Sequence, residues 1–225
     1  MTLSSLFERC LHISYTRVGR SADYARERIG STLYLYFEAS DGAADWKSNL
    51  NFPAKPYRRM DGPVWFAHRG FLQVWKTIEP YVADDIADPT VKAIVLVGYS
   101  HGAAVAALCH EYVWYHRPDL RKAMRGYGFG CPRVFWGISS SACRRRWAQF
   151  CVIRNIDDIV THVPPAILGF SHVGKMLEIG TRGTYSRVDA HRPENILAEL
   201  KRYENESGLS TAPVLILQTA SHRHP

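Results

Sequence analysis

The sequence lacks any apolar run of the roughly 20 residues that a membrane-spanning helix needs. Residues 1–10 also lack a basic stretch followed by an unbroken apolar one, so we expect no secretory signal. Cysteine is sparse, because the chain has five cysteines and no Cys-x-x-Cys pair, which argues against a disulfide framework or a zinc knuckle. These absences predict a cytoplasmic protein with reduced cysteines.

Acidic residues are outnumbered by basic ones, 21 against 28, which gives a formal net charge of +7. A positive balance suits an anionic membrane surface or nucleic acid. The densest cluster, Arg144-Arg145-Arg146, is expected on a solvated helix face that extends to Trp147, and no nucleic-acid-binding motif accompanies it. We therefore expect no nucleic-acid partner, whereas peripheral contact with an anionic membrane stays open.

Alternation of strand-like and helix-like segments predicts an α/β domain with a largely parallel sheet. The length suits a single domain over residues 1–225. Runs typical of buried strands occupy residues 33–37, 91–97, 126–132, 150–154 and 175–179. Helical spacing is expected over residues 4–15, 21–29, 71–86, 103–116 and 193–203. Residues 53–64 contain three prolines, and we expect an irregular loop there.

The most informative motif is Gly98-Tyr99-Ser100-His101-Gly102, which joins the apolar run at 91–97 to the helix expected from Ala103. A buried strand, a Gly-x-Ser-x-Gly turn and a helix together describe a nucleophile elbow. The two glycines are needed because a side chain would clash in so sharp a turn. The motif favours an α/β-hydrolase-like fold with a serine nucleophile over an ordinary turn that carries a surface serine.

A serine nucleophile needs a base and an orienting carboxylate, which follow it in the order acid, then histidine, on an α/β-hydrolase sheet. After Ser100, the strand at 150–154 leads into Asp157 and Asp158, the candidate acids. The later histidines are His162, His172, His191, His222 and His224. His191 lies in a loop before a helix, where a base can reach the serine, and His172 precedes a strand. Position alone does not decide between these two histidines.

Seven short blocks over roughly residues 30–200 stand in the order typical of one family. The blocks are Phe37-Glu-Ala-Ser40 followed by Asp45-Trp46 and Asn49-Leu50, His68-Arg-Gly-Phe71, Gly98-Tyr-Ser-His-Gly102, Gly128-Phe-Gly-Cys-Pro-Arg133, Asn155-Ile-Asp-Asp-Ile-Val160 followed by Pro164-Pro165, Gly169-Phe-Ser-His-Val-Gly174, and Asp189-Ala-His191. With them the chain resembles the class 3 lipases, the fungal triacylglycerol-lipase type and especially its small bacterial relatives. No single block is specific, but seven in order are.

The resemblance implies a serine carboxylic-ester hydrolase, a lipase or esterase that acts on small-molecule or lipid esters through an acyl-enzyme. It makes Ser100 the nucleophile, Asp158 the acid and His191 the base. It also implies an oxyanion hole with donors from the backbone N–H of His101 and from Ser40. No metal, organic cofactor or protein partner is implied.

Further residues take supporting or uncertain roles by the same resemblance. His172 and His68 fall on structural positions beside the site. Glu38-Ala39 stands where the family usually has Arg-Gly, which puts the shape of the oxyanion loop in question. The segment 43–48 falls where fungal relatives carry an apolar lid, but Trp46 is its only large apolar residue. Two rival functions stay open, an A1-type phospholipase with the same triad and a catalytically silent interaction domain.

Overall fold

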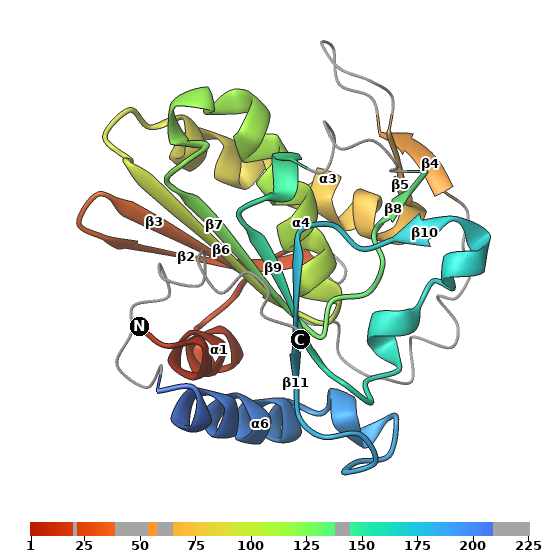
Figure 1. Ribbon diagram of the computed structural model, residues 1–225. Coiled ribbons are helices and arrows are strands. Elements are labelled where there is room, and N and C mark those ends of the chain that lie inside the picture. Colours follow the sequence, from red (N-terminus) through yellow and green to blue (C-terminus); the bar gives the residue numbers. More distant parts are fainter. Residues whose placement is uncertain (20–21, 39–53, 58–64, 138–144, 209–225) are drawn as a thin grey trace.

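A seven-stranded sheet forms the centre of the molecule, with strand order β1-β2-β3-β6-β7-β9-β11 (Figure 1). The computed structural model describes residues 1–19, 22–38, 54–57, 65–137 and 145–208. The strands are β1 (Thr16–Gly19), β2 (Ala22–Ile29), β3 (Thr32–Phe37), β6 (Ala93–Tyr99), β7 (Met124–Phe129), β9 (Phe150–Asn155) and β11 (Lys175–Ile179). The four pairings from β3 to β11 are parallel, whereas β1, β2 and β3 pair antiparallel at one edge. The predicted mostly parallel sheet is confirmed.

Helices cover both faces of this sheet (Figure 1). Helices α3 (Arg69–Ala87) and α4 (His101–His116) pack on one face, and α1 (Leu3–His12) and α6 (Pro193–Glu206) lie side by side on the other. Strand β6 shows why both faces need cover, because Ile94 and Leu96 point to the α3–α4 side and Val97 to the α1–α6 side. All three side chains are fully buried, as is usual in a parallel sheet.

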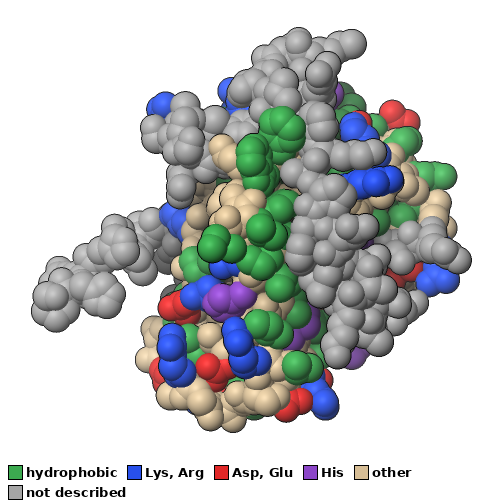
Figure 2. Space-filling model, turned by 90° about the vertical axis from the view of Figure 1, so that its right-hand side faces the viewer, with side chains coloured by type: hydrophobic (Ala, Val, Ile, Leu, Met, Phe, Trp, Pro, Cys, Tyr) green, Lys and Arg blue, Asp and Glu red, His purple; other side chains and the backbone are tan. Residues whose placement is uncertain are grey.

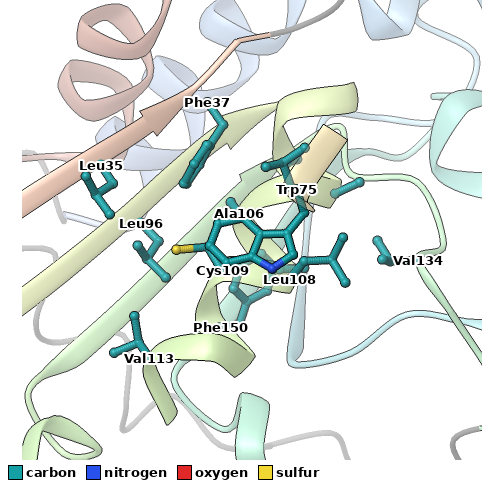
Figure 3. Close-up of a cluster of buried hydrophobic side chains, with 14 of the residues drawn as sticks. Leu35, Phe37, Trp75, Leu96, Ala106, Leu108, Cys109, Val113, Val134 and Phe150 are labelled. Atoms are coloured by element: carbon teal, nitrogen blue, oxygen red, sulfur yellow. The ribbon is translucent and has the colours of Figure 1, made fainter. Parts of the chain in front are cut away.

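The larger apolar cluster fills the space between the sheet and helices α3 and α4 (Figure 3). Trp75 of α3 is fully buried there and meets the ring of Phe37 edge-on, with ring centroids 6.5 Å apart. Helix α4 is buried from Gly102 to Glu111, because the turn around Trp147 covers its outer side. The Trp147 indole N–H donates to the carbonyl of Ala107 at 3.1 Å. This packing holds the start of α4 firmly against the sheet.

A second, smaller antiparallel sheet that the sequence did not predict has the strand order β10-β8-β5-β4. Its strands are β4 (Ala54–Tyr57), β5 (Trp65–His68), β8 (Phe135–Trp136) and β10 (Phe170–Ser171). The expectation of an irregular loop over 53–64 is therefore wrong at β4. Pro56 is tolerated there because β4 is an edge strand, which has a neighbouring strand on one side only.

The helix expected over residues 21–29 is also wrong, because this segment is strand β2. Its charged side chains alternate between the two sides of the sheet: Arg26 and Arg28 pair with acidic groups at the end of α3 and just beyond it, and Glu27 pairs with Arg9 of α1. Pairing with β3 from Tyr24 to Ile29 outweighs the local helical spacing.

The expectation of a solvated helix face over residues 144–147 fails as well. Residues Arg145–Trp147 form a single 3-10 turn. The Arg146 side chain is only 13% exposed and pairs at 3.1 Å with Glu111, which is fully buried. The guanidinium also lies over the ring of Tyr115, 4.7 Å from its centroid. Arg146 therefore neutralises a buried carboxylate, and Arg144 lies outside the described residues.

Candidate active site

The turn from β6 into α4 holds Ser100 in a strained backbone conformation, with φ at +54° and ψ at −118°. Its N–H donates to the carbonyl of Phe129 at 2.8 Å, which ties the turn to β7. A Cβ on Gly98 would lie 2.2 Å from the carbonyl oxygen of Gly102, and one on Gly102 would lie 2.1 Å from that of Phe37. Only glycine fits at both positions, so the serine sits in a nucleophile elbow.

Three of the residues singled out from the sequence meet at this turn. His191 Nε2 lies 2.8 Å from Ser100 Oγ, and His191 Nδ1 lies 2.8 Å from Asp158 Oδ2. Asp158 is fully buried, whereas Ser100 and His191 are 4% and 9% exposed. A charge on Asp158 is therefore shielded from water and acts at short range on the imidazole.

The turn after β9 directs the carboxylate of Asp158, and not that of Asp157, toward His191. The second carboxylate oxygen of Asp158 accepts from the N–H of Val160 at 2.8 Å, and the Thr161 hydroxyl donates to its carbonyl at 2.8 Å. The carboxylate of Asp157 points elsewhere and accepts from the N–H of Gly183 at 2.7 Å. The two aspartates, equivalent in sequence order, are thus directed to different partners.

His191 lies in a 3-10 turn, Asp189–His191. Two residues to which the sequence analysis gave no role, Tyr99 and Gly130, lie against it. The Tyr99 hydroxyl donates to the His191 carbonyl at 2.6 Å, and the two rings stack with centroids 5.2 Å apart. Burial raises the pKa of Tyr99, so its hydroxyl keeps its proton. Gly130 has φ at +57°, and a Cβ there would lie 2.7 Å from His191 Cε1.

Both residues stand inside conspicuous motifs of the sequence. Tyr99 belongs to the elbow itself, and Gly130 directly follows β7, within the glycine-rich segment 126–132. No local pattern shows that these positions face a histidine sixty or more residues later.

His172 does not contact Ser100. Its Nε2 lies 2.7 Å from the carbonyl oxygen of Thr161, to which it donates, so it braces the turn that carries Asp158. Burial lowers the pKa of His172 to about 4. His162 lies in the same turn, with Nδ1 3.1 Å from the Asp158 carbonyl. His68 is buried, and its ring lies tilted by 41° against that of Phe71, with ring centroids 4.4 Å apart. Burial lowers the pKa of His68 to about 4.

The expected oxyanion donors are described in part. His101 is the first residue of α4, and the first N–H groups of a helix have no partner within it. Burial and the nearby His68 lower the pKa of the His101 side chain to about 4, which keeps it neutral. Ser40 lies outside the described residues, as does the segment 43–48. The close approach of Phe37 to Gly102 brings the end of β3 directly over the start of α4.

Within the described residues, no three His, Cys, Asp or Glu side chains are grouped so that they could hold a metal ion. The four described cysteines carry free thiols, and burial raises the pKa of Cys10, Cys131 and Cys151. No helix in this part of the chain is both long enough and apolar enough to cross a membrane.

The sequence model of the family described as lipase (class 3) matches residues 34–168, more than half of the chain. The chain belongs to the class 3 lipase family. The match includes Ser100 and Asp158 and ends before His191. In this class 3 lipase family member, His191 lies beyond the matched segment. Its contact with Ser100 is therefore seen in the tertiary structure and not in the family match.

Curated relatives of this class 3 lipase family member include two fungal lipases. The lipase of Rhizomucor miehei is 28% identical over 167 residues, which cover 69% of this chain and 44% of that lipase. The lipase of Rhizopus oryzae is 30% identical over 149 residues, which cover 64% of this chain and 37% of that lipase. The chain thus spans less than half the length of these relatives.

Solved structures share the fold. A fungal lipase in complex with an inhibitor superposes with a TM-score of 0.66 at 21% identity, covering 80% of this chain and 78% of that one. A triacylglycerol lipase with a catalytic centre formed by a serine-protease triad gives a TM-score of 0.63 at 23% identity, covering 75% and 67%. This class 3 lipase family member therefore has the α/β-hydrolase fold of the lipases.

Proposed function

We propose that the chain is a serine carboxylic-ester hydrolase with the triad Ser100, His191 and Asp158. The observation that carries the proposal is the pair of 2.8 Å contacts that converge on the two nitrogens of the buried His191 imidazole. The strained backbone of Ser100, at the end of a central strand, supports it because such a turn exposes the hydroxyl for attack. Membership of the lipase family agrees with this chemistry.

The geometry supports the following sequence of events. Asp158 accepts the N–H of His191 Nδ1, which leaves Nε2 unprotonated and facing the Ser100 hydroxyl. Nε2 takes the hydroxyl proton as Oγ attacks the ester carbonyl, and the Asp158 carboxylate balances the imidazolium. The imidazolium gives its proton to the departing alcohol, which leaves an acyl-enzyme. Water then attacks the acyl carbonyl as Nε2 takes its proton. The bond between the carbonyl carbon and Oγ breaks, the imidazolium returns the proton to Oγ, and the free acid leaves.

The negative charge that develops on the carbonyl oxygen needs donors. We place the backbone N–H of His101 in this role, supported by its position at the N-terminus of the 16-residue helix α4. For the second donor we keep Ser40. The approach of the Phe37 carbonyl to Gly102 supports this choice, because Ser40 follows three residues later in the chain.

For the substrate we propose lipid or small-molecule acyl esters, since the fungal relatives are lipases. The net charge of +7 favours substrates presented on an anionic surface, and so keeps an A1-type phospholipase activity as the second candidate. Hydrolysis of triglyceride emulsions and of phosphatidylcholine with distinct acyl chains, compared side by side, separates the two. The single domain over residues 1–225 and the cytoplasmic location stay predictions.

Labelling with a fluorophosphonate tests the nucleophile directly. We expect one covalent adduct on the Ser100 peptide by mass spectrometry and none in Ser100→Ala, with Ser31→Ala as an exposed serine control that labels like the wild type. Asp158→Asn and His191→Ala are expected to lower kcat on p-nitrophenyl butyrate by several decades, and their combination by little more. An unlabelled wild-type protein would favour the catalytically silent domain, and an adduct on another serine would refute the triad.

A further inference from the structure

Phe7 of helix α1 packs against two strand ends beside the nucleophile turn, although the proposed mechanism gives it no role. Its ring meets that of Tyr99 edge-on, with centroids 5.5 Å apart. It lies against the ring of Phe129 at a tilt of 33°, with centroids 4.6 Å apart. Tyr99 and Phe129 are the last residues of β6 and β7 and stand opposite each other in the sheet. One side chain of α1 therefore contacts the carboxyl ends of two central strands.

Each of the two residues that Phe7 contacts holds one member of the proposed triad. Tyr99 donates its hydroxyl to the carbonyl of His191 at 2.6 Å and stacks on the imidazole. The Phe129 carbonyl accepts the N–H of Ser100 at 2.8 Å. Phe7 is thus separated by a single residue from both the proposed base and the proposed nucleophile.

Helix α1 also holds α6, the helix that follows His191. The N–H and the hydroxyl of Ser4 both donate to the buried Glu204 carboxylate, at 2.9 Å and 2.5 Å. At the other end of α6, the side-chain amide of Asn195 donates to the carbonyl of Asp189 at 2.8 Å, within the turn that carries His191. The N-terminal helix therefore supports this turn both through packed rings and through hydrogen bonds.

Phe7 has no access to a substrate or to solvent. Figure 2 shows hydrophobic side chains in a band on one face of the molecule, beside Lys and Arg. The Phe7 side chain is instead fully buried, in the cluster between the sheet and helices α1 and α6. An effect of Phe7 on hydrolysis must therefore pass through the side chains that it packs against. Both α1 and the His191 turn lie outside residues 34–168, so the family match does not include this contact.

We propose that Phe7 is a positioning residue, which backs the Tyr99 ring and so keeps the His191 imidazole in line with the Ser100 hydroxyl. Interior side chains are close-packed, so a ring held on one face by a neighbour cannot turn. A smaller side chain at position 7 leaves space into which the Tyr99 ring can tilt. The stacked imidazole then moves with it, and Nε2 leaves its place opposite the Ser100 hydroxyl. The proposal rests on the proposed function, because it concerns the same triad.

Two pairs of variants separate positioning from stability. Phe7→Leu and Phe7→Ala reduce the contact in two steps. Ile86→Val and Ile86→Ala are the controls, because Ile86 is also fully buried but lies near the end of α3, on the other face of the sheet. All four variants remove buried carbon atoms and should lower Tm. If Phe7→Ala does not fold, Phe7→Leu and Ile86→Val carry the comparison.

Steady-state hydrolysis of p-nitrophenyl butyrate, measured well below the Tm of every variant, is the first readout. We expect kcat to fall roughly 3- to 10-fold in Phe7→Leu and further in Phe7→Ala, with KM unchanged, because the reacting geometry changes and the substrate contacts do not. The Ile86 variants should keep kcat within about twofold of the wild type. A wild-type kcat in Phe7→Leu, equal losses in the Phe7 and Ile86 variants, or a change in KM alone overturns the proposal.

A double-mutant cycle with Tyr99 tests the route of the effect. In the Tyr99→Leu background the ring that Phe7 supports is absent. Adding Phe7→Leu there should lower kcat by no more than about twofold. An equal fold-loss in both backgrounds would show that Phe7 acts by another route, and would overturn the proposal.

Proton NMR distinguishes failure of this proposal from failure of the hydrolase. The proton that His191 Nδ1 shares with Asp158 gives a resonance far downfield, which is identified by its loss in His191→Ala. The resonance should shift or broaden in Phe7→Leu and stay unchanged in Ile86→Val, whether or not the wild type hydrolyses an ester. That pattern in a protein without esterase activity removes the function and leaves the route from Phe7 to His191 standing. An active enzyme whose resonance and kcat do not respond to Phe7 does the reverse.

Discussion

Replacing Gly130 by alanine should damage catalysis through a single added methyl group. The new Cβ would lie 2.7 Å from Cε1 and 2.9 Å from Nδ1 of His191, and 3.2 Å from Oδ2 of Asp158. Carbon atoms do not approach so closely, so the imidazole must move by a few tenths of an ångström or more. The methyl group would clash with the two side chains whose hydrogen bond orients the proposed base, His191 and Asp158.

Two separate costs follow from the structure. Gly130 has φ at +57°, and alanine in that left-handed region loses about 1–2 kcal/mol of stability. For a chain of this length that corresponds to a fall in Tm of roughly 2–8 °C. Displacement of the imidazole acts on rate instead, and misplacement of a catalytic group by about 1 Å costs on the order of 100-fold. We expect kcat to fall by roughly 10- to 100-fold.

Gly30→Ala separates the two costs. Gly30 has φ at +60°, close to that of Gly130, but nothing lies within 4 Å of a Cβ built there. Both variants should therefore lose a similar few degrees of Tm by differential scanning calorimetry, whereas only Gly130→Ala should lose kcat on p-nitrophenyl butyrate. A Gly130→Ala enzyme that melts lower yet keeps kcat within about twofold of the wild type would refute the reasoning.

Three further outcomes are expected. Tyr99→Phe removes the hydrogen bond to the His191 carbonyl but keeps the stacked ring, so kcat should fall roughly 3- to 10-fold with KM unchanged. Tyr99→Leu also removes the ring, and its kcat should be lower still. Equal kcat values for the two variants would count against a positioning role for Tyr99. Glu204→Ala leaves the buried N–H and hydroxyl of Ser4 without their acceptor, and urea unfolding should show a loss of roughly 2–4 kcal/mol, against almost none for the exposed Glu206→Ala. Burial lowers the pKa of His110 from 6.5 to about 3, so below pH 6.5 the unfolded chain binds a proton that the folded chain does not, and stability falls as pH falls. Between pH 7 and 5 the free energy of unfolding should fall by about 1–2 kcal/mol more in the wild type than in His110→Asn. Parallel curves of unfolding free energy against pH for the two proteins would contradict this.

Local sequence was sufficient for the features that depend on neighbouring residues. The elbow around Ser100 could be recognised because its glycines, its strand and its helix are contiguous, and steric exclusion acts within those few residues. The buried strands could be found because both faces of a parallel sheet are covered, which makes their sequences almost uniformly apolar. The order of acid and histidine after Ser100 follows from strand order, so the candidate residues could be narrowed to a few.

Residue positions alone left those candidates open; the family resemblance named Asp158 and His191, and the tertiary structure shows how they come to face Ser100. Asp157 and Asp158 are adjacent in sequence, and it is the hydrogen bonds of the turn after β9 that aim Asp158 at the histidine. His191 faces Ser100, whereas His172 donates its hydrogen bond to the Thr161 carbonyl. Strand β2 and the small sheet were missed because strand pairing contributes more free energy than the propensity of a short segment. Residue order alone does not show which segments will pair, whether the partner is the next segment, as β3 is for β2, or a distant one, as β8 is for β5.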